Sequence, residues 1–221
     1  MKIENNIIKY YMKNTYFITG TAYAGKSTMV RMLAEKHDMI FCGENYHDAV
    51  ASAVRNTENQ PALCYFDTMS GWKEFLNRTP EEYYTWIKKA SEEAAEFEIA
   101  ELIRLSAKEK KIIVDTNISP DILREISDYD HVAVMLSMQS MSVDKFFDRD
   151  DTEKQFLLRQ ISLTDDPKRT MLNFKACIAK INCKEEYDRF ADSGFFTLVR
   201  ENNDKDTKMQ MLESLEAHFK L

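Results

Sequence analysis

The chain contains few residues that interrupt secondary structure: only five of its 221 residues are glycine and four are proline. This scarcity predicts long helices and strands with short connections. No apolar stretch approaches the roughly 20 residues of a membrane-spanning helix. The first six residues also lack the apolar core of a signal peptide. We therefore expect a soluble cytoplasmic protein with no membrane partner.

Metal-binding cysteine pairs and dense basic runs are also missing. The spacing of the cysteines includes no C-x-x-C pair, and the C-x₅-C of the last two is not a zinc spacing. Reduced, mostly buried thiols are expected at Cys42, Cys64, Cys177 and Cys183. The formal net charge is −7 and lysine and arginine form no dense run, which argues against a nucleic-acid partner. A single nucleotide needs only a local positive pocket.

Apolar segments that read as strands alternate with helical segments along the whole chain. Met39–Cys42 is such a segment, and Lys111–Asp115 reads as a fully buried strand that ends in an acid. The alternation predicts an α/β fold in one domain over 1–221, a three-layer α/β/α arrangement around a mostly parallel five-stranded sheet. The expected strands are 15–19, 39–42, 111–115, 131–136 and 195–199. Residues 62–66 fit either a short strand or a buried turn of helix.

Several helix starts can be recognised. Thr79-Pro80-Glu81-Glu82 combines an N-cap, a proline at the first helical position and a capping-box glutamate, and it predicts a helix to about 108. Ser119-Pro120 and Asp166-Pro167 open two more helices. Further helices are expected to about 37, over 46–57, within 139–183 and at the C-terminal end.

The most informative segment is Gly20-Thr21-Ala22-Tyr23-Ala24-Gly25-Lys26-Ser27. It fits G-x-x-x-x-G-K-[ST], the phosphate-binding loop, and it lies between an expected strand and an expected helix, as that motif requires. Glycines let backbone N–H groups turn toward an anion, and the helix N-terminus adds a positive dipole end. The expected nucleotide-binding residues are Gly20, Thr21, Ala22, Tyr23, Ala24, Gly25, Lys26, Ser27 and Thr28. Lys26 is expected to reach the β- and γ-phosphates, and Ser27 to hold Mg²⁺.

On residues 16–37 the chain resembles the P-loop small-molecule kinases, which include nucleoside monophosphate, nucleoside and shikimate kinases. The rest of the chain matches them in element order and length only. The resemblance implies ATP and Mg²⁺ as cofactors and a small-molecule phosphate acceptor. It also implies a substrate-binding helical insert, for which 46–108 is the candidate, and a lid, for which 139–183 is the candidate. Tyr23 departs from the glycine that many of these kinases carry, and we expect it to stiffen the loop.

Phosphoryl transfer also needs carboxylates. Asp115, which closes a strand, is the expected second Mg²⁺ ligand, and a helix cap or turn residue is the alternative interpretation. Glu44 stands where several of these kinases keep a base or a metal-linked acid, although it also fits a solvated loop acid. Asp67 competes with Glu44 for this role.

Arginines of the lid candidate are expected, by resemblance, to close over the transferred phosphate. Arg149 and Arg159 are the candidates, and a solvated ion-pair face is the alternative for both. The catalytic set is therefore Lys26, Asp115, Glu44, Arg149 and Arg159. The expected function is an ATP-dependent kinase acting on a small metabolite. An ATP-binding regulatory or assembly module is the alternative, and a polynucleotide end kinase is disfavoured by the acidic balance.

Overall fold

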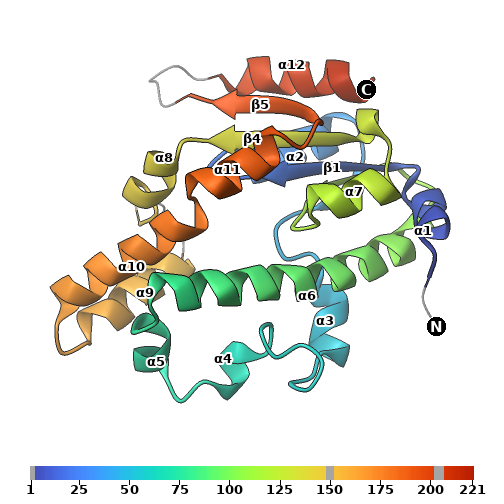
Figure 1. Ribbon diagram of the computed structural model, residues 1–221. Helices are drawn as coiled ribbons and strands as arrows, with labels where there is room; N and C mark the ends of the chain where they lie inside the picture. Colours follow the sequence, from blue (N-terminus) through green and yellow to red (C-terminus); the bar gives the residue numbers. More distant parts are fainter. Residues whose placement is uncertain (1–2, 148–151, 202–206) are drawn as a thin grey trace.

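The computed structural model describes residues 3–147, 152–201 and 207–221, and its centre is a five-stranded sheet (Figure 1). The strands lie in the order β2-β3-β1-β4-β5, and every pair is parallel. Every residue of β3 and β4 is buried. The five strands are β1 Thr15–Gly20, β2 Ile40–Cys42, β3 Ile112–Asp115, β4 Val132–Ser137 and β5 Phe196–Arg200. The expected α/β class is confirmed, with an all-parallel sheet in place of a mostly parallel one.

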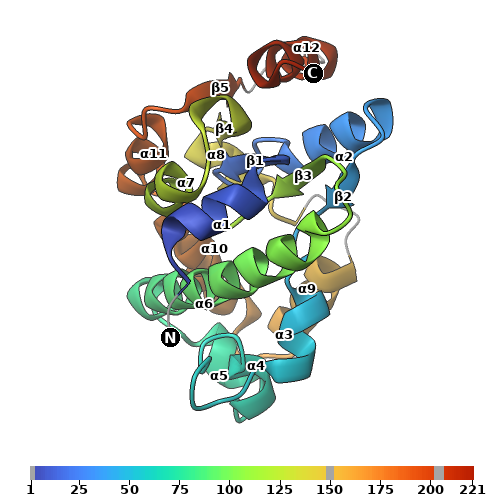
Figure 2. The same ribbon diagram turned by 90° about the vertical axis from the view of Figure 1, so that its right-hand side faces the viewer.

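Helices cover both faces of the sheet and extend beyond one end of it (Figures 1 and 2). A 3-10 turn, Tyr129–His131, precedes β4. The helices are α1 Asn5–Met12, α2 Lys26–Lys36, α3 Asp48–Val54, α4 Tyr65–Thr68, α5 Trp72–Leu76, α6 Pro80–Ser106, α7 Pro120–Ile126, α8 Gln139–Asp144, α9 Thr152–Ser162, α10 Pro167–Ile181, α11 Lys184–Ala191 and α12 Lys208–Phe219.

Two apolar clusters hold these helices on the sheet. On one face α2 and α12 pack against β1, β3 and β4, with Leu33 and Leu215 fully buried. On the other face α1, α6 and α7 pack against the same strands around Phe17 and Leu102, as Figure 2 shows from the end of the sheet. Each such side chain contributes about 1.5–3 kcal/mol to folding when it leaves water. The arrangement is a three-layer α/β/α sandwich.

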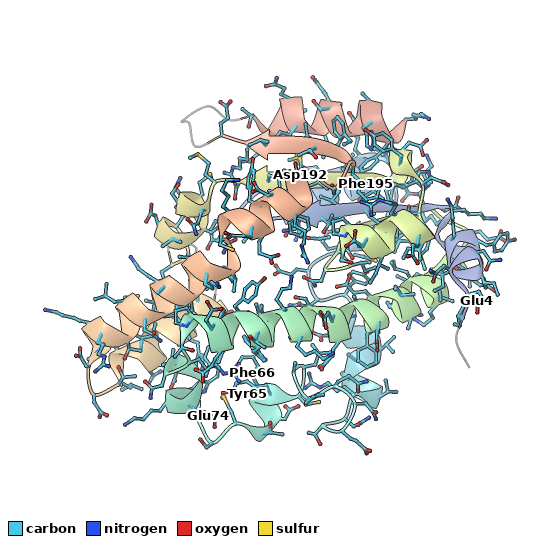
Figure 3. All side chains as sticks on the ribbon, viewed as in Figure 1. Glu4, Tyr65, Phe66, Glu74, Asp192 and Phe195 are labelled. Carbon is cyan, nitrogen blue, oxygen red and sulfur yellow. The ribbon has the colours of Figure 1, made fainter. Side chains whose placement is uncertain are left out.

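A third cluster is separate from the sheet and joins the first half of α6 to α4, α5 and α8–α10. It is rich in aromatic rings, among them Tyr65, Phe75, Trp86 and Phe174, whose centroids lie 5.5–6.3 Å apart in neighbouring pairs. Figure 3 places Tyr65 and Phe66 between α6 and the α4–α5 segment. Trp72, Phe75, Tyr83 and Trp86 therefore serve as the packing core of this helical part.

Local signals explain most of the boundaries. The Thr79 side chain accepts a hydrogen bond from the Glu82 amide, and the Glu82 carboxylate accepts one from the Thr79 amide, which is the predicted capping box. Residues 62–66 form turns and the start of α4, so the helical interpretation is the correct one there. The four cysteines are free, and three of them are buried. Among the helices of the described residues, none is long and apolar enough to cross a membrane.

Candidate active site

The 20–28 loop joins β1 to α2 at the carboxyl edge of the sheet (Figure 1). Gly20 has a φ of 127°, and a Cβ there would lie 2.0 Å from the carbonyl oxygen of Met135 on β4. Only glycine allows this approach, because two backbones meet where the side chain would be. The Thr21 amide then donates to the same Met135 oxygen at 3.0 Å. The first glycine of the motif thus sets how the loop leaves the sheet.

The end of the loop is the N-terminus of α2. Gly25 precedes Lys26 with a φ of 92°, a left-handed conformation that glycine adopts without strain. No side chain caps the helix. The first-turn amides of α2 and the positive end of its dipole are therefore not shielded by a capping oxygen, which suits them to an anion.

Three side chains converge beside this helix start. The Ser27 hydroxyl donates to Asp115 Oδ2 at 2.6 Å. Lys26 Nζ lies 3.9 Å from Asp115 Oδ1 and donates to the Thr21 carbonyl at 3.1 Å. Asp115, the last residue of β3, is only 6% exposed. The structure therefore brings the predicted lysine, serine and strand-ending acid into one group.

The strands on the other side of β1 also hold the loop. Thr21 Oγ1 accepts from the Ser137 amide at 2.8 Å, and the Ser137 hydroxyl donates to the Ala22 carbonyl. Arg200 Nη1 donates to the Tyr23 carbonyl at 2.9 Å. Ser137 ends β4 and Arg200 ends β5. Neither residue was predicted to belong to the site, although each ends a strand, as Asp115 does.

Tyr23 fastens the loop to the segment that follows α8. Its φ of 64° is unusual for a residue with a side chain. Its hydroxyl donates to the Phe146 carbonyl at 3.0 Å, and Lys154 Nζ lies 5.9 Å from its ring centre. These two contacts connect the 20–28 loop with the 139–183 segment.

The loop opens into a cavity of about 1330 Å³. Along α6 the lining residues recur every three or four positions, so one face of this helix forms a wall: Tyr84, Ile87, Lys88, Ser91, Glu92 and Ala95. Glu44 and Asn45, Asp115–Asn117, and Glu186 with Arg189 of α11 line it as well. The cavity reaches well beyond the 20–28 loop.

One carboxylate bridges α6 and α11 across this cavity. The Tyr84 hydroxyl donates to Glu186 Oε1 at 2.5 Å, Lys88 Nζ lies 3.1 Å from the same oxygen, and Arg189 lies 3.3 Å from Oε2. Burial favours a raised pKa for Glu186, but the Tyr84 hydrogen bond and the two positive charges hold the pKa below its ordinary value. Glu186 is therefore ionised at neutral pH.

Glu98 of α6 is a buried carboxylate that contacts the two residues following Asp115. It is fully buried and accepts hydrogen bonds from Tyr46, Thr116 and Asn117. Burial raises the pKa of Glu98, and the hydrogen bonds from Thr116 and Asn117 oppose that rise. Nothing in the sequence pattern distinguished Glu98 from the other acids of the long helix.

Other expected site residues lie elsewhere. Glu44 is exposed and lines the cavity, whereas Asp67 is exposed on α4, pairs with Arg55 at 3.1 Å and does not line it. Arg159 is exposed on α9 and is not among the cavity-lining residues, where α9 contributes Lys154 instead. Arg149 lies outside the described residues.

The site can offer backbone amides and a lysine to an anion, and adjacent hydroxyl and carboxylate oxygens to a hard cation. Comparison of the chain with protein-family models, with curated proteins and with solved structures finds no match.

Proposed function

We propose that this protein is an ATP-dependent kinase of the P-loop small-molecule type. Its acceptor would be a small metabolite such as a nucleoside, a nucleotide or a similarly sized hydroxylated compound. The observation that carries the proposal is the 2.6 Å bond between Ser27 and Asp115, with Lys26 beside it at the start of α2. Ser27 lies at the start of α2 and Asp115 at the end of β3, 88 positions apart in the chain.

The residues present fit ATP and Mg²⁺. The α2 amides and Lys26 suit the triphosphate, because both offer positive charge at the loop. Mg²⁺ favours oxygen ligands, and Ser27 with Asp115 presents a hydroxyl and a buried carboxylate side by side. Bound there, the ion would neutralise charge on the phosphates during transfer.

Each residue of the chain then has a defined task. Lys26 would exchange its hydrogen bond with the Thr21 carbonyl for the phosphate oxygens. Glu44, which lines the cavity, would orient or deprotonate the acceptor hydroxyl. Lys154 of α9 would take the part expected of the lid arginines, since it lines the cavity while Arg159 does not. Catalysis would consist of positioning and electrostatics, with water excluded by closure.

The size of the cavity favours a kinase over a regulatory nucleotide-binding module. Pockets for one small molecule are typically about 300–1,000 Å³, and this cavity measures about 1330 Å³. The α6 wall lies in the candidate insert 46–108 and adds polar side chains such as Ser91 and Lys88. A second small molecule would therefore find both room and hydrogen-bond partners beside the nucleotide.

The test is ADP release from MgATP in the presence of a panel of nucleosides, nucleoside monophosphates and hydroxylated metabolites. Strong stimulation by one compound would establish the kinase and name its acceptor class. Tight ATP binding with no stimulation by any compound would instead support the regulatory module.

Substitution of Lys26 by alanine links that activity to the site. We expect Lys26→Ala to lower turnover by at least about 10²–10³-fold, because a preorganised charge at the transferred phosphate is lost. The fold should remain intact, as shown by an unchanged circular dichroism spectrum. Lys89→Ala is the matched control, since Lys89 is an exposed lysine on α6 that pairs with Glu92 and does not line the cavity. Unchanged turnover in Lys26→Ala would contradict the assignment of the site.

A further inference from the structure

Glu98 is a carboxylate at a buried position, where a charged group lowers the free energy of unfolding unless it is well paired. Its side chain is fully buried near the middle of α6, and no lysine or arginine pairs with it in the described residues, although Nδ1 of the His47 ring lies 3.9 Å from Oε1. An apolar side chain of similar size is often neutral or better for stability than a buried charge. The contacts of Glu98 therefore call for an explanation other than the stability of the core.

Those contacts go to two loops at the carboxyl edge of the sheet. Thr116 donates its hydroxyl to Oε2, and Asn117 donates its amide to Oε2 at 3.1 Å and its side chain to Oε1 at 2.9 Å. The Tyr46 hydroxyl donates to Oε2 at 3.1 Å. Thr116 and Asn117 directly follow Asp115, and Tyr46 stands two residues after Glu44. One carboxylate thus holds the loops that carry both proposed acids.

The loop after β3 is also fastened to the central strand. The Thr116 amide donates to the Ile18 carbonyl at 3.1 Å, and the Thr19 hydroxyl donates to the Thr116 carbonyl at 3.3 Å. Thr116 is therefore held by β1 on one side and by Glu98 on the other. Because Thr116 is held on both sides, the position of the preceding residue Asp115 is also restricted. Asp115 Oδ2 accepts the hydrogen bond from the Ser27 hydroxyl at 2.6 Å.

We propose that Glu98 is a positioning residue that sets Asp115 for Mg²⁺ and joins the Asp115 loop to the Glu44 turn. The inference rests on the proposed function, since it gives Asp115 a metal. Partners that orient a metal ligand from behind typically change metal affinity by about 10–100-fold when they are removed. Glu98 stands in that relation to Asp115 through Thr116 and Asn117.

The test measures nucleotide affinity by titration calorimetry with a non-hydrolysable ATP analogue, in Mg²⁺ and in EDTA. Glu98→Gln keeps the size of the side chain but turns an amide donor toward groups that already donate. We expect the gain in affinity from Mg²⁺ to fall about tenfold in Glu98→Gln, while the affinity in EDTA stays at the wild-type value.

Glu101→Gln is the matched control. Glu101 lies on the same helix and is also buried, but its hydrogen bonds go to Arg104 and it holds no loop of the site. The Mg²⁺ effect should be unchanged in this variant. An equal loss in both variants would assign Glu98 a merely structural role and overturn the inference, as would a wild-type Mg²⁺ effect in Glu98→Gln.

A second variant covers the case in which Glu98→Gln does not fold. Thr116→Val removes one donor to Glu98 and leaves the carboxylate in place, and it should lower the Mg²⁺ effect in the same direction. A full Mg²⁺ effect in Thr116→Val would again overturn the inference. If the wild-type protein binds no nucleotide, or binds it equally with and without Mg²⁺, the proposed function fails before Glu98 is tested.

Discussion

Alanine substitution of the two glycines of the 20–28 loop can distinguish the energetic effect of steric overlap from that of backbone strain. Both have positive φ, 127° at Gly20 and 92° at Gly25, so alanine is strained at either position. That strain costs about 1–2 kcal/mol of folding free energy. At Gly25 a new Cβ meets nothing closer than 3.9 Å, but at Gly20 it meets the Met135 carbonyl oxygen at 2.0 Å.

Relief of the Gly20 overlap needs a shift of about 1 Å, because real Cβ atoms essentially never approach closer than 3.0 Å. The shift would disturb the hydrogen bond from the Thr21 amide to Met135 and the neighbouring pairing of β1 with β4. Two weakened backbone bonds add roughly 1–3 kcal/mol. We therefore expect Gly20→Ala to lose about 2–5 kcal/mol and Gly25→Ala about 1–2 kcal/mol.

The assay is urea unfolding followed by circular dichroism at 222 nm, without nucleotide. The free energies of unfolding of both variants and the wild type are compared at matched m-values. A Gly20→Ala chain that does not fold beside a folded Gly25→Ala chain satisfies the expectation as well. Equal losses in the two variants would refute the close approach of the loop to β4.

Three further predictions concern the contact of the 20–28 loop with the 139–183 segment, the third apolar cluster and the C-terminal helix. Tyr23→Phe removes the hydrogen bond to the Phe146 carbonyl and should lower the free energy of unfolding by about 0.5–1.5 kcal/mol; a wild-type urea midpoint would contradict that bond. Phe174→Ala, at a side chain only 2% exposed, should cost about 3–5 kcal/mol in the same assay, and a loss below about 1 kcal/mol would show that the third cluster is loosely packed. Burial lowers the pKa of His218, so between the folded and the unfolded pKa the unfolded chain binds more protons than the folded one. The contribution of His218 to the free energy of unfolding is therefore full above the unfolded pKa of about 6.5 and is lost as the pH falls below that value. His218→Gln should therefore show a smaller drop in melting temperature between pH 7.5 and 5.5 than the wild type, and an equal drop would contradict a lowered pKa of this half-buried ring.

The fold was predictable from the sequence where the signal is local. The capping box at Thr79 depends on four consecutive residues, and the buried strand that ends at Asp115 shows its own apolar run. The short helices α1 and α11 were not predicted. Both helices have a clear apolar side, but each is only eight residues long, and α1 buries Met12 alone while α11 buries no residue. A stripe over two turns is too short a pattern to stand out from the polar segments around it.

The site was predictable only as far as its residues follow a motif or end a strand. Lys26, Ser27 and Asp115 lie together as expected. Glu98 contacts the residues after Asp115 from α6, a helix that starts 35 residues before Asp115 in the chain. Its role depends on which loops α6 crosses, which is set by the packing of α6 on the sheet. Lys154 was not predicted to line the cavity for the same reason, because the rotation of α9 about its axis cannot be read from its charges.

The central place of β1 in the sheet also has a consequence for synthesis. β1 pairs with β3 and β4 and not with its neighbour in sequence, and its first residue, Thr15, is matched with Ile112. About 97 residues separate the two partners. At a ribosomal rate of about 5–20 residues per second, β3 follows β1 by roughly 5–20 s. Throughout that interval the strand that later lies at the centre of the sheet has both of its edges unpaired, so the nascent chain exposes there a strand that can pair with another chain and aggregate.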